Sequence, residues 1–328
     1  MKNASTFAAR CLVLLVCGMV QACRANIYTS RVTVVVHDDD GLPVTNAQVE
    51  ADFTWGGDWN GRGEHVVTKK GATDSNGVFE TSGPSVNFLV IVKQTGFYDW
   101  QSKTKTLSYY KALGPKKEVL IKEDPTIPVT LSKIGHTISL FAFKFKDTIP
   151  PVTNSAVGFD LVAGDWIAPF GQGHTADIFF ELESAKRSKQ DIENTLTLSF
   201  PNKGDGIVSS SFTPSSEFGS VLQMRRAAPA DGYVSNKIVH LKLTPGHLEQ
   251  DYDEHRCYFF RMRTAMDGDR VVSALYGKTS GDFHMDYSGV VEWTYYVNPT
   301  PNERNLEWNG KNLTPHGSSG IHFSIPAP

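Results

Sequence analysis

Several short stretches of the chain alternate apolar and polar residues with a period of two, which is the pattern of half-buried β-strands. Val32, Val34 and Val36 form one such apolar face, and residues 47–53 carry a second. Residues 86–93, VNFLVIVK, are almost continuously apolar, as in a central strand that is buried on both faces. Clusters of Gly, Asp, Asn and Pro separate these runs and indicate turns.

The remainder of the chain shows the same β-like character. Only residues 180–194, FELESAKRSKQDIEN, have a helix-like composition. We expect at most a short surface helix or a turn there, and its first residues could equally be the end of a strand. The sequence therefore predicts an all-β protein, with an N-terminal β-sandwich over residues 28–109, a proline- and lysine-rich connector over 110–130, and a second, larger β-sandwich-like domain over 131–328. Strand candidates in the second domain are 137–146, 176–183, 195–200, 239–243, 258–264, 270–276 and 290–297.

The first 22 residues have the organisation of a secretory signal peptide, with a basic start, a short apolar run and small residues at its end. The apolar run is too short for a stable transmembrane helix, which needs about 20 residues. The run ends in Val20-Gln21-Ala22-Cys23, which resembles the lipobox of bacterial lipoproteins. That resemblance implies that Cys23 becomes the acylated first residue of a chain held at the membrane by lipid. Ordinary cleavage after Ala22, which would release a secreted or periplasmic protein, is the alternative.

Cysteine content and charge limit the partners further. Removal of the signal peptide leaves Cys23 and Cys257, of which Cys257 lies in the strand-like run RCYFF and is expected to be buried and inert. A disulfide between these two cysteines is the alternative, and it requires ordinary cleavage. The signal peptide also contains two of the 32 basic residues and no acid, so 30 basic residues face 35 acidic ones in the mature chain. This net negative charge argues against a nucleic-acid partner.

Two polar turn motifs and a glycine-aromatic pair follow one another in a recognisable order along the chain. They are HDDDGLPVTNAQV at residues 37–49, TDSNGVF at 73–79 and the pair Gly96-Phe97. The arrangement resembles the carboxypeptidase regulatory-like, or transthyretin-like, β-sandwich over residues 31–100, whose turns also occur in bacterial Ig-like modules. The resemblance implies a module that is non-catalytic in its usual settings and serves as a stability, spacing or binding domain. The usual proline-glycine-tyrosine entry to the third motif is replaced here by GPSVNFLVIV. A calcium site at residues 38–40 is the alternative to a plain turn.

The later segments 158–183 and 295–313 look like parts of secreted bacterial proteins that pair such domains. This similarity adds to the predicted architecture. It implies no activity.

A glycine-rich loop at residues 54–65, TWGGDWNGRGEH, is the main candidate for ligand binding. Exposed indoles beside amide and carboxylate groups could stack on a sugar and form hydrogen bonds with it. The alternative is a hairpin whose tryptophans turn back onto the sandwich. The candidate ligand-binding residues are Trp55, Asp58, Trp59, Asn60 and Arg62.

Signs of catalysis are weak. Asp160, Asp165 and Asp177 are the acids that could in principle provide paired carboxylates for glycoside hydrolysis. The acidic stretch 246–255, GHLEQDYDEH, lacks a metal-binding spacing and indicates a solvated loop. No serine-nucleophile, P-loop or dinucleotide motif is present, and we expect neither metal nor cofactor.

These features favour a non-catalytic cell-envelope protein that acts in surface structure, adhesion or ligand binding, with a glycan or an envelope protein as its partner. The first alternative is a carbohydrate-binding protein that uses the Trp55/Trp59 loop. The second is a secreted hydrolase with its site in the second domain.

Overall fold

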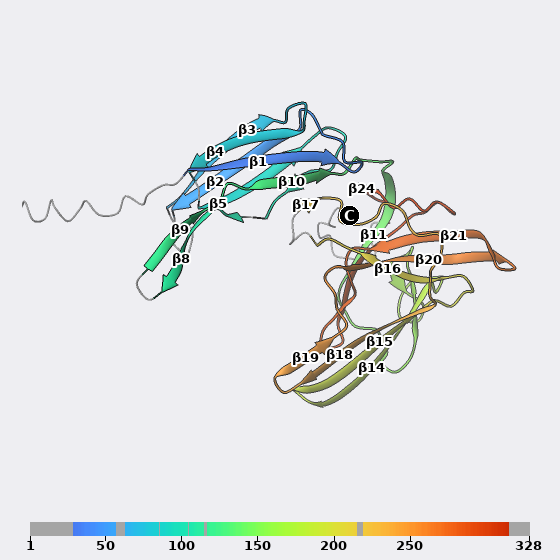
Figure 1. Ribbon diagram of the computed structural model, residues 1–328. Coiled ribbons are helices and arrows are strands. Elements are labelled where there is room, and N and C mark those ends of the chain that lie inside the picture. Colours follow the sequence, from blue (N-terminus) through green and yellow to red (C-terminus); the bar gives the residue numbers. More distant parts are fainter. Residues whose placement is uncertain are drawn as a thin grey trace, which may run out of the picture. The chain divides into compact units, whose positions relative to one another are not determined.

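The computed structural model describes residues 29–56, 63–84, 86–103, 105–114, 117–214 and 219–314. These residues form β-strands, and the chain is all-β within the part described (Figure 1). No helix that could span a membrane occurs among them. The chain divides into two compact units. The first comprises residues 1–95 and 99–131, and the second comprises residues 96–98 and 132–328.

The first unit contains two sheets and a separate hairpin. One sheet has the order β10-β1-β4, in which β10 runs parallel to β1, and the other runs β6-β5-β2-β3, with β7 also paired to β5. Its strands are β1 (Thr29–Asp38), β2 (Gln48–Gly56), β3 (Glu64–Ala72), β4 (Val78–Pro84), β5 (Asn87–Lys93), β6 (Trp100–Gln101), β7 (Lys105–Thr106), β8 (Ser108–Gly114), β9 (Lys117–Lys122) and β10 (Thr126–Leu131).

The two predicted alternating faces of this unit are confirmed, whereas residues 87–92 of β5, expected to be buried on both faces, alternate between half-buried and buried. Val32, Val34 and Val36 of β1 are completely buried, as is Phe53 of β2. The two sheets approach closely, because a Cβ added to Gly83 of β4 would lie 2.6 Å from the ring of Phe53. The sandwich core is therefore formed by the alternating residues that the sequence pattern identifies.

The segment 110–130, expected to be a connector, contains β9 and most of β8 and β10. Strand β10 pairs with β1. Its alternating residues Ile127, Val129 and Leu131 face inward, while the residues between them are exposed. The lysines and prolines around it conceal this period of two in the sequence. The first compact unit accordingly extends to Leu131.

The second unit contains two larger sheets. One has the order β16-β20-β21-β23-β11-β24, with β22 paired to β23, and the other has the order β13-β12-β14-β15-β18-β19 (Figure 1). The strands of this unit are β11 (Ile138–Thr148), β12 (Val157–Asp160), β13 (Asp165–Trp166), β14 (Ile178–Ser188), β15 (Asp191–Ser199), β16 (Gly206–Ser211), β17 (Gly219–Ser220), β18 (Asn236–Thr244), β19 (His247–Gln250), β20 (Arg256–Asp267), β21 (Arg270–Thr279), β22 (His284–Met285), β23 (Val291–Val297) and β24 (Trp308–Asn312).

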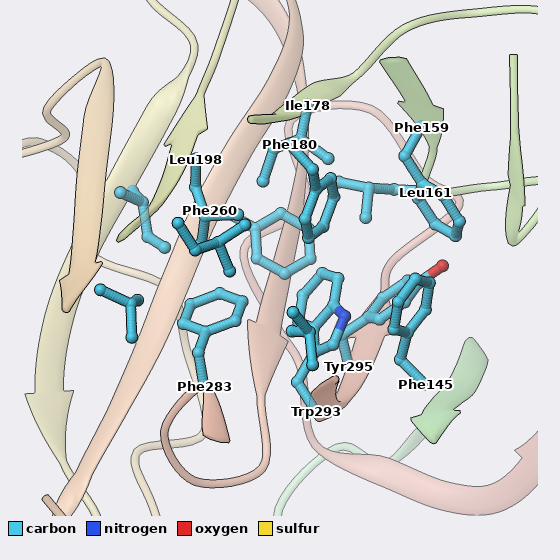
Figure 2. Close-up of a cluster of buried hydrophobic side chains, with 14 of the residues drawn as sticks. Phe145, Phe159, Leu161, Ile178, Phe180, Leu198, Phe260, Phe283, Trp293 and Tyr295 are labelled. Carbon is cyan, nitrogen blue, oxygen red and sulfur yellow. The ribbon is translucent and has the colours of Figure 1, made fainter. Parts of the chain in front are cut away.

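Aromatic side chains from both sheets fill the main core of the second unit (Figure 2). The ring of Phe180 on β14 lies 6.0 Å from that of Phe145 on β11, and Phe159 on β12 lies 5.3 Å from Phe145. Trp293 and Tyr295 of β23 stack with centroids 4.5 Å apart. Edge-to-face and offset contacts of this kind add to the hydrophobic free energy that burial of these rings supplies.

The first of these two sheets is covered on its other face as well. A smaller cluster that includes Leu140, Phe259, Tyr296 and Leu306 packs there. Strand β23 is consequently buried on both sides, which explains why its sequence, VEWTYYV, is apolar almost without interruption.

Residues 180–194 form no helix. This region is the hairpin of β14 and β15, which pair antiparallel from Phe179 to Ser188, and the expected turn lies at residues 189–190 between them. Inward residues such as Phe180 and Leu182 recur with a period of two, whereas the charged end of β14 is exposed. The charge of that exposed end produced the helix-like composition.

Candidate functional site

The acidic stretch at residues 38–40 is built around one carboxylate. Oδ1 of Asp38 accepts hydrogen bonds from the backbone N–H groups of Asp40 and Leu42, both at 2.9 Å. Gly41 adopts a φ of 77°, which favours glycine. The Asp38 side chain therefore has a structural role in the turn between β1 and β2.

The first two sequence motifs also meet in space. The hydroxyl of Thr73 donates to the carbonyl of Val44 at 2.6 Å and accepts from the N–H of Ala47 at 2.9 Å. Gly77, with a φ of 74°, lies so close to β1 that an added Cβ would be 2.3 Å from the carbonyl oxygen of Val36. Thr73 and Gly77 thus fix the two turns against each other.

Only part of the predicted ligand-binding loop lies within the described residues. Trp55, near the end of β2, is partly buried and stacks on His65 of β3 with centroids 5.4 Å apart. The other four candidates, Asp58, Trp59, Asn60 and Arg62, lie outside the described residues, as does Cys23. Of the five candidate ligand-binding residues, the structure therefore describes only Trp55, which forms a cross-strand aromatic pair with His65.

Two of the three candidate acids of the second unit converge, and they do so on an arginine. Nε of Arg263 on β20 donates to Oδ1 of Asp177 at 2.8 Å, and Nη2 donates to Oδ2 of the same residue at 2.9 Å. Nη2 also donates to Oδ1 of Asp160 at 2.8 Å. Asp165 makes different contacts, in which its carboxylate accepts from the N–H groups of Trp166 and Gln172.

The two convergent carboxylates are further occupied by backbone groups. Asp160 accepts N–H groups from the loop that follows it and from His174 and Thr175. Burial alone would raise the pKa of Asp160, but these hydrogen bonds and the charge of Arg263 lower it below its usual value. For Asp177, which also accepts the N–H of Leu161, burial outweighs the arginine and raises the pKa.

Sequence reasoning missed Arg263 and its support, Asp205. Arg263 has a φ of 52° at a β-bulge, where the register of β20 against β21 shifts. The Asp205 carboxylate holds this bulge by accepting the N–H groups of Arg263 and Thr264, at 3.1 and 2.8 Å. No local signal marks these residues, because their partners are brought together by sheet pairing.

A hollow of about 280 Å³ opens beside β16. We call it the β16 hollow. Its apolar lining comes from Ile207, Val208 and Val234. Its polar lining comes from Ser209, Asn236, Lys237, Arg256 and Tyr258.

Ion pairs hold the two cations of the β16 hollow in place. Nη2 of Arg256 lies 2.6 Å from Oδ2 of Asp282 and 2.9 Å from Oδ1 of Asp251, and Nζ of Lys237 is also paired with Asp251. The Asp282 side chain is completely buried. Partial burial acts to raise the pKa of Asp251, but hydrogen bonds from Lys237 and Arg256 lower it overall. The guanidinium carbon of Arg256 also lies 6.0 Å from the ring centroid of Tyr258.

These contacts correct the interpretation of residues 246–255 as a solvated loop. His247–Gln250 form the exposed edge strand β19, and Asp251, which follows this strand, is ion-paired with Arg256. The N–H of Asp253 donates to the Asp282 carboxylate at 2.9 Å. The high local charge of the sequence therefore reflects buried and half-buried pairing as well as solvation.

Two reactive side chains of the second unit are sealed inside it. Cys257 is buried, as predicted, and forms no disulfide with any described residue; its thiol donates to the carbonyl of Ser211 at 3.3 Å. Burial raises the pKa of this thiol to about 12. Lys278 is also completely buried, and its Nζ forms no hydrogen bond with any described residue. Burial lowers the pKa of Lys278 to about 7, and the ammonium group lies 5.6 Å from the ring centroid of Tyr296.

Comparisons with known proteins do not assign the chain to a family. No family model matches the chain, and no curated protein matches it. Among solved structures, the major pilin SpaD of Corynebacterium diphtheriae is similar at 10% identity, covering 83% of this chain and 93% of the pilin, with a TM-score of 0.25. The major pilin subunit BcpA of Bacillus cereus is 10% identical, with coverages of 88% and 98% and a TM-score of 0.20.

A third similar structure is an enzyme. It is the 3-chlorocatechol 1,2-dioxygenase of Rhodococcus opacus 1CP, at 14% identity and a TM-score of 0.22. The match covers 34% of this chain and 62% of the dioxygenase. Similarities at this level support no functional assignment.

Proposed function

We propose that the protein is a non-catalytic cell-envelope protein whose two β-rich units serve surface structure, adhesion or ligand binding. The observation that carries this proposal is the state of the carboxylates best suited to hydrolysis. Asp160 and Asp177 are directed onto Arg263 and backbone N–H groups, and the Asp177 side chain has no exposed surface. A glycosidase needs two carboxyl groups that flank a bound sugar, so this arrangement supports a structural role for the cluster.

The character of the first unit supports the same proposal. The turn at Asp38 and the contact between Gly77 and β1 fit a carboxypeptidase regulatory-like sandwich, a module that is non-catalytic. We place the chain at the membrane through a lipid on Cys23, on the strength of the lipobox-like residues 20–23. An envelope protein or a glycan would then be its partner.

Metabolic labelling with radioactive palmitate tests the anchor. The wild-type chain and a Cys257→Ala control should incorporate label, whereas Cys23→Ala should not. Label absent from all three chains would contradict lipid attachment, and a secreted or periplasmic protein would replace it.

An assay panel of polysaccharides and peptides tests the absence of catalysis. The wild-type chain should turn over none of these substrates. Turnover that disappears in Asp177→Asn but survives in a matched Asp191→Asn chain, which removes an exposed acid of β15, would overturn the proposal. This test does not depend on the lipid anchor.

Carbohydrate binding at the predicted loop is a second candidate function. Trp55 is only partly buried and is held flat against His65, so one indole is presented at this end of β2 and β3. A glycan array that compares wild type with Trp55→Ala and Trp59→Ala tests it. Binding that is unchanged in both variants would remove the loop from consideration.

A further inference from the structure

The β16 hollow has the size of a site for one small unit. Its volume of about 280 Å³ lies just below the range for small-molecule clefts, which is roughly 300–1,000 Å³. A single ring with its substituents fills such a volume.

The polar lining of the hollow offers hydrogen-bond donors, and ion pairs fix the positions of two of them, Lys237 and Arg256. Lys237 uses its ammonium group on Asp251, but an ammonium group has three N–H donors. The hydrogen bonds of the Arg256 side chain with described residues use Nε and Nη2, and none of them uses Nη1. Ser209 and Asn236 add an exposed hydroxyl and an exposed amide. A ligand with several oxygen atoms matches this set.

The charge of the hollow favours a neutral ligand. The two cations, Lys237 and Arg256, are balanced by the carboxylates of Asp251 and Asp282. A free anion would meet these carboxylates and gain little from cations that are already paired. A hydroxyl group can both donate and accept, so it can bind to such a network without adding charge.

The lining of the hollow also contains apolar side chains. Val234 is 56% exposed, and Val208 and Ile207 belong to the same lining. Such a surface suits the C–H face of a sugar ring. Because ion pairs hold Lys237 and Arg256 in place, binding costs little side-chain entropy at these two residues.

An extended peptide added to the edge of β16 fits less well. Ile207 and Val234 exchange both of their backbone hydrogen bonds, at 2.9 Å each, so this part of the edge is already occupied. The hollow therefore offers side chains more readily than a free strand edge.

From these observations we propose that the β16 hollow binds one neutral, hydroxyl-rich sugar unit of a glycan. This inference deepens the ligand-binding part of the proposed function and makes no use of the lipid anchor or of the Trp55 loop. A free sugar and the end of a longer chain present the same hydroxyl groups.

A variant that fills the hollow gives the sharpest test. Ser209→Tyr places a large side chain in the hollow at an exposed strand position where tyrosine is well tolerated. The matched control is Ser211→Tyr, which makes the same change at the next outward position of β16, outside the lining. Thermal melts establish that both variants fold like the wild type. If Ser209→Tyr does not fold, Asn236→Ala, which removes only an exposed amide from the lining, takes its place.

Binding is measured on an array of neutral and acidic glycans, together with their free monosaccharides. The apparent affinity is then determined for each neutral glycan that binds. Wild type and Ser211→Tyr should bind a neutral glycan or its monosaccharide, and Ser209→Tyr should lose at least about tenfold in affinity. Four results would overturn the inference. They are no binding of any neutral sugar, equal binding by Ser209→Tyr, salt-sensitive binding of acidic glycans alone, and loss of binding in Trp55→Ala but not in Ser209→Tyr. Only turnover in the assay panel would bear on the non-catalytic proposal, so the two failures are distinguishable.

Discussion

Nε of Arg263 lies 2.8 Å from Oδ1 of Asp177, and this pair links β20 in one sheet of the second unit to the start of β14 in the other. The Asp177 side chain is fully buried, whereas 30% of the Arg263 side chain is exposed. The pair therefore costs desolvation mainly at the carboxylate. Its value to the protein lies in fixing how two sheets meet at the end of the aromatic core.

Removal of the arginine should destabilise the second unit strongly. Arg263→Met leaves Asp177 buried without its charged partner, and a loss of about 3 kcal/mol is expected, the lower end of the range for broken buried pairs because Arg263 is partly exposed. Urea unfolding followed by near-UV circular dichroism measures it. Arg270→Met, which breaks an exposed pair with Asp267, should cost no more than about 0.5 kcal/mol. Equal losses in the two variants would contradict a special role for Arg263.

A double variant separates lost pairing from lost packing. If the cost of Arg263→Met comes from an uncompensated carboxylate, Asp177→Asn should recover part of it in the double variant. The recovery should exceed about 1 kcal/mol, since the side chains of Arg263 and Asp177 are in direct contact. Strict additivity of the two single losses would show that the charge of Asp177 is not what destabilises Arg263→Met.

This cluster shows how far the sequence predicts the site. Asp160 and Asp177 are recognisable as candidate acids, but Arg263 is 103 and 86 positions away from them along the chain. Their meeting depends on sheet order and on one bulge in β20, which local patterns do not encode. The sequence therefore identifies the two acids as candidates, but it does not predict that they meet at Arg263.

The fold was predictable where alternation is strong and unpredictable where charge obscures it. The faces at Val32 and Phe53 follow directly from a period of two. The charged end of β14 hides a strand, because an exposed strand end and a surface helix have similar compositions. The burial of Lys278 could not be predicted either, since nothing in the sequence distinguishes this completely buried lysine from an exposed one.

The position of Gly77 yields a prediction on the first unit. Gly77→Ala combines a left-handed φ with a Cβ that would lie 2.3 Å from a backbone oxygen of β1, so we expect a loss of about 3 kcal/mol or more. Gly41→Ala is the matched control, because Gly41 has almost the same φ but nothing lies within 4 Å of its added Cβ. That control should lose only about 1–2 kcal/mol, the cost of the left-handed backbone. Similar melting temperatures for the two variants would refute the close packing of Gly77 on β1.

Burial of Cys257 predicts an inert thiol. In a mature chain with Cys23→Ala, a disulfide-exchange reagent should react with Cys257 in the native state many times more slowly than in urea, because the thiol is enclosed and its pKa is raised to about 12. Spectrophotometric titration of the released thiolate measures both rates. In the chain that retains Cys23, absence of a free thiol even after unfolding would instead indicate a Cys23–Cys257 disulfide.

Lys278 predicts an unusual dependence of stability on pH. Its pKa is about 7 in the folded protein and 10.5 in the unfolded chain, so between these values the unfolded state binds more protons. The free energy of unfolding should therefore rise with pH from about 7 towards 10, by up to about 1.4 kcal/mol per pH unit from this group. Below pH 7 the ammonium form is present in both states, and the group's cost to the fold is greatest.

Substitution by methionine isolates this effect. Lys278→Met keeps a long side chain and removes the buried charge, so it should stabilise the protein at pH 7 by about 1–4 kcal/mol. The gain should shrink as the pH rises, because the wild-type lysine is then neutral when folded. Urea titrations of both chains at pH 7, 8 and 9 give the difference directly, and other titrating groups cancel in it. Lys203→Met, at an exposed position paired with Asp269, should show no such trend. A difference between Lys278→Met and wild type that is constant across this range would mean that the lysine keeps its ordinary pKa and finds a partner in solution.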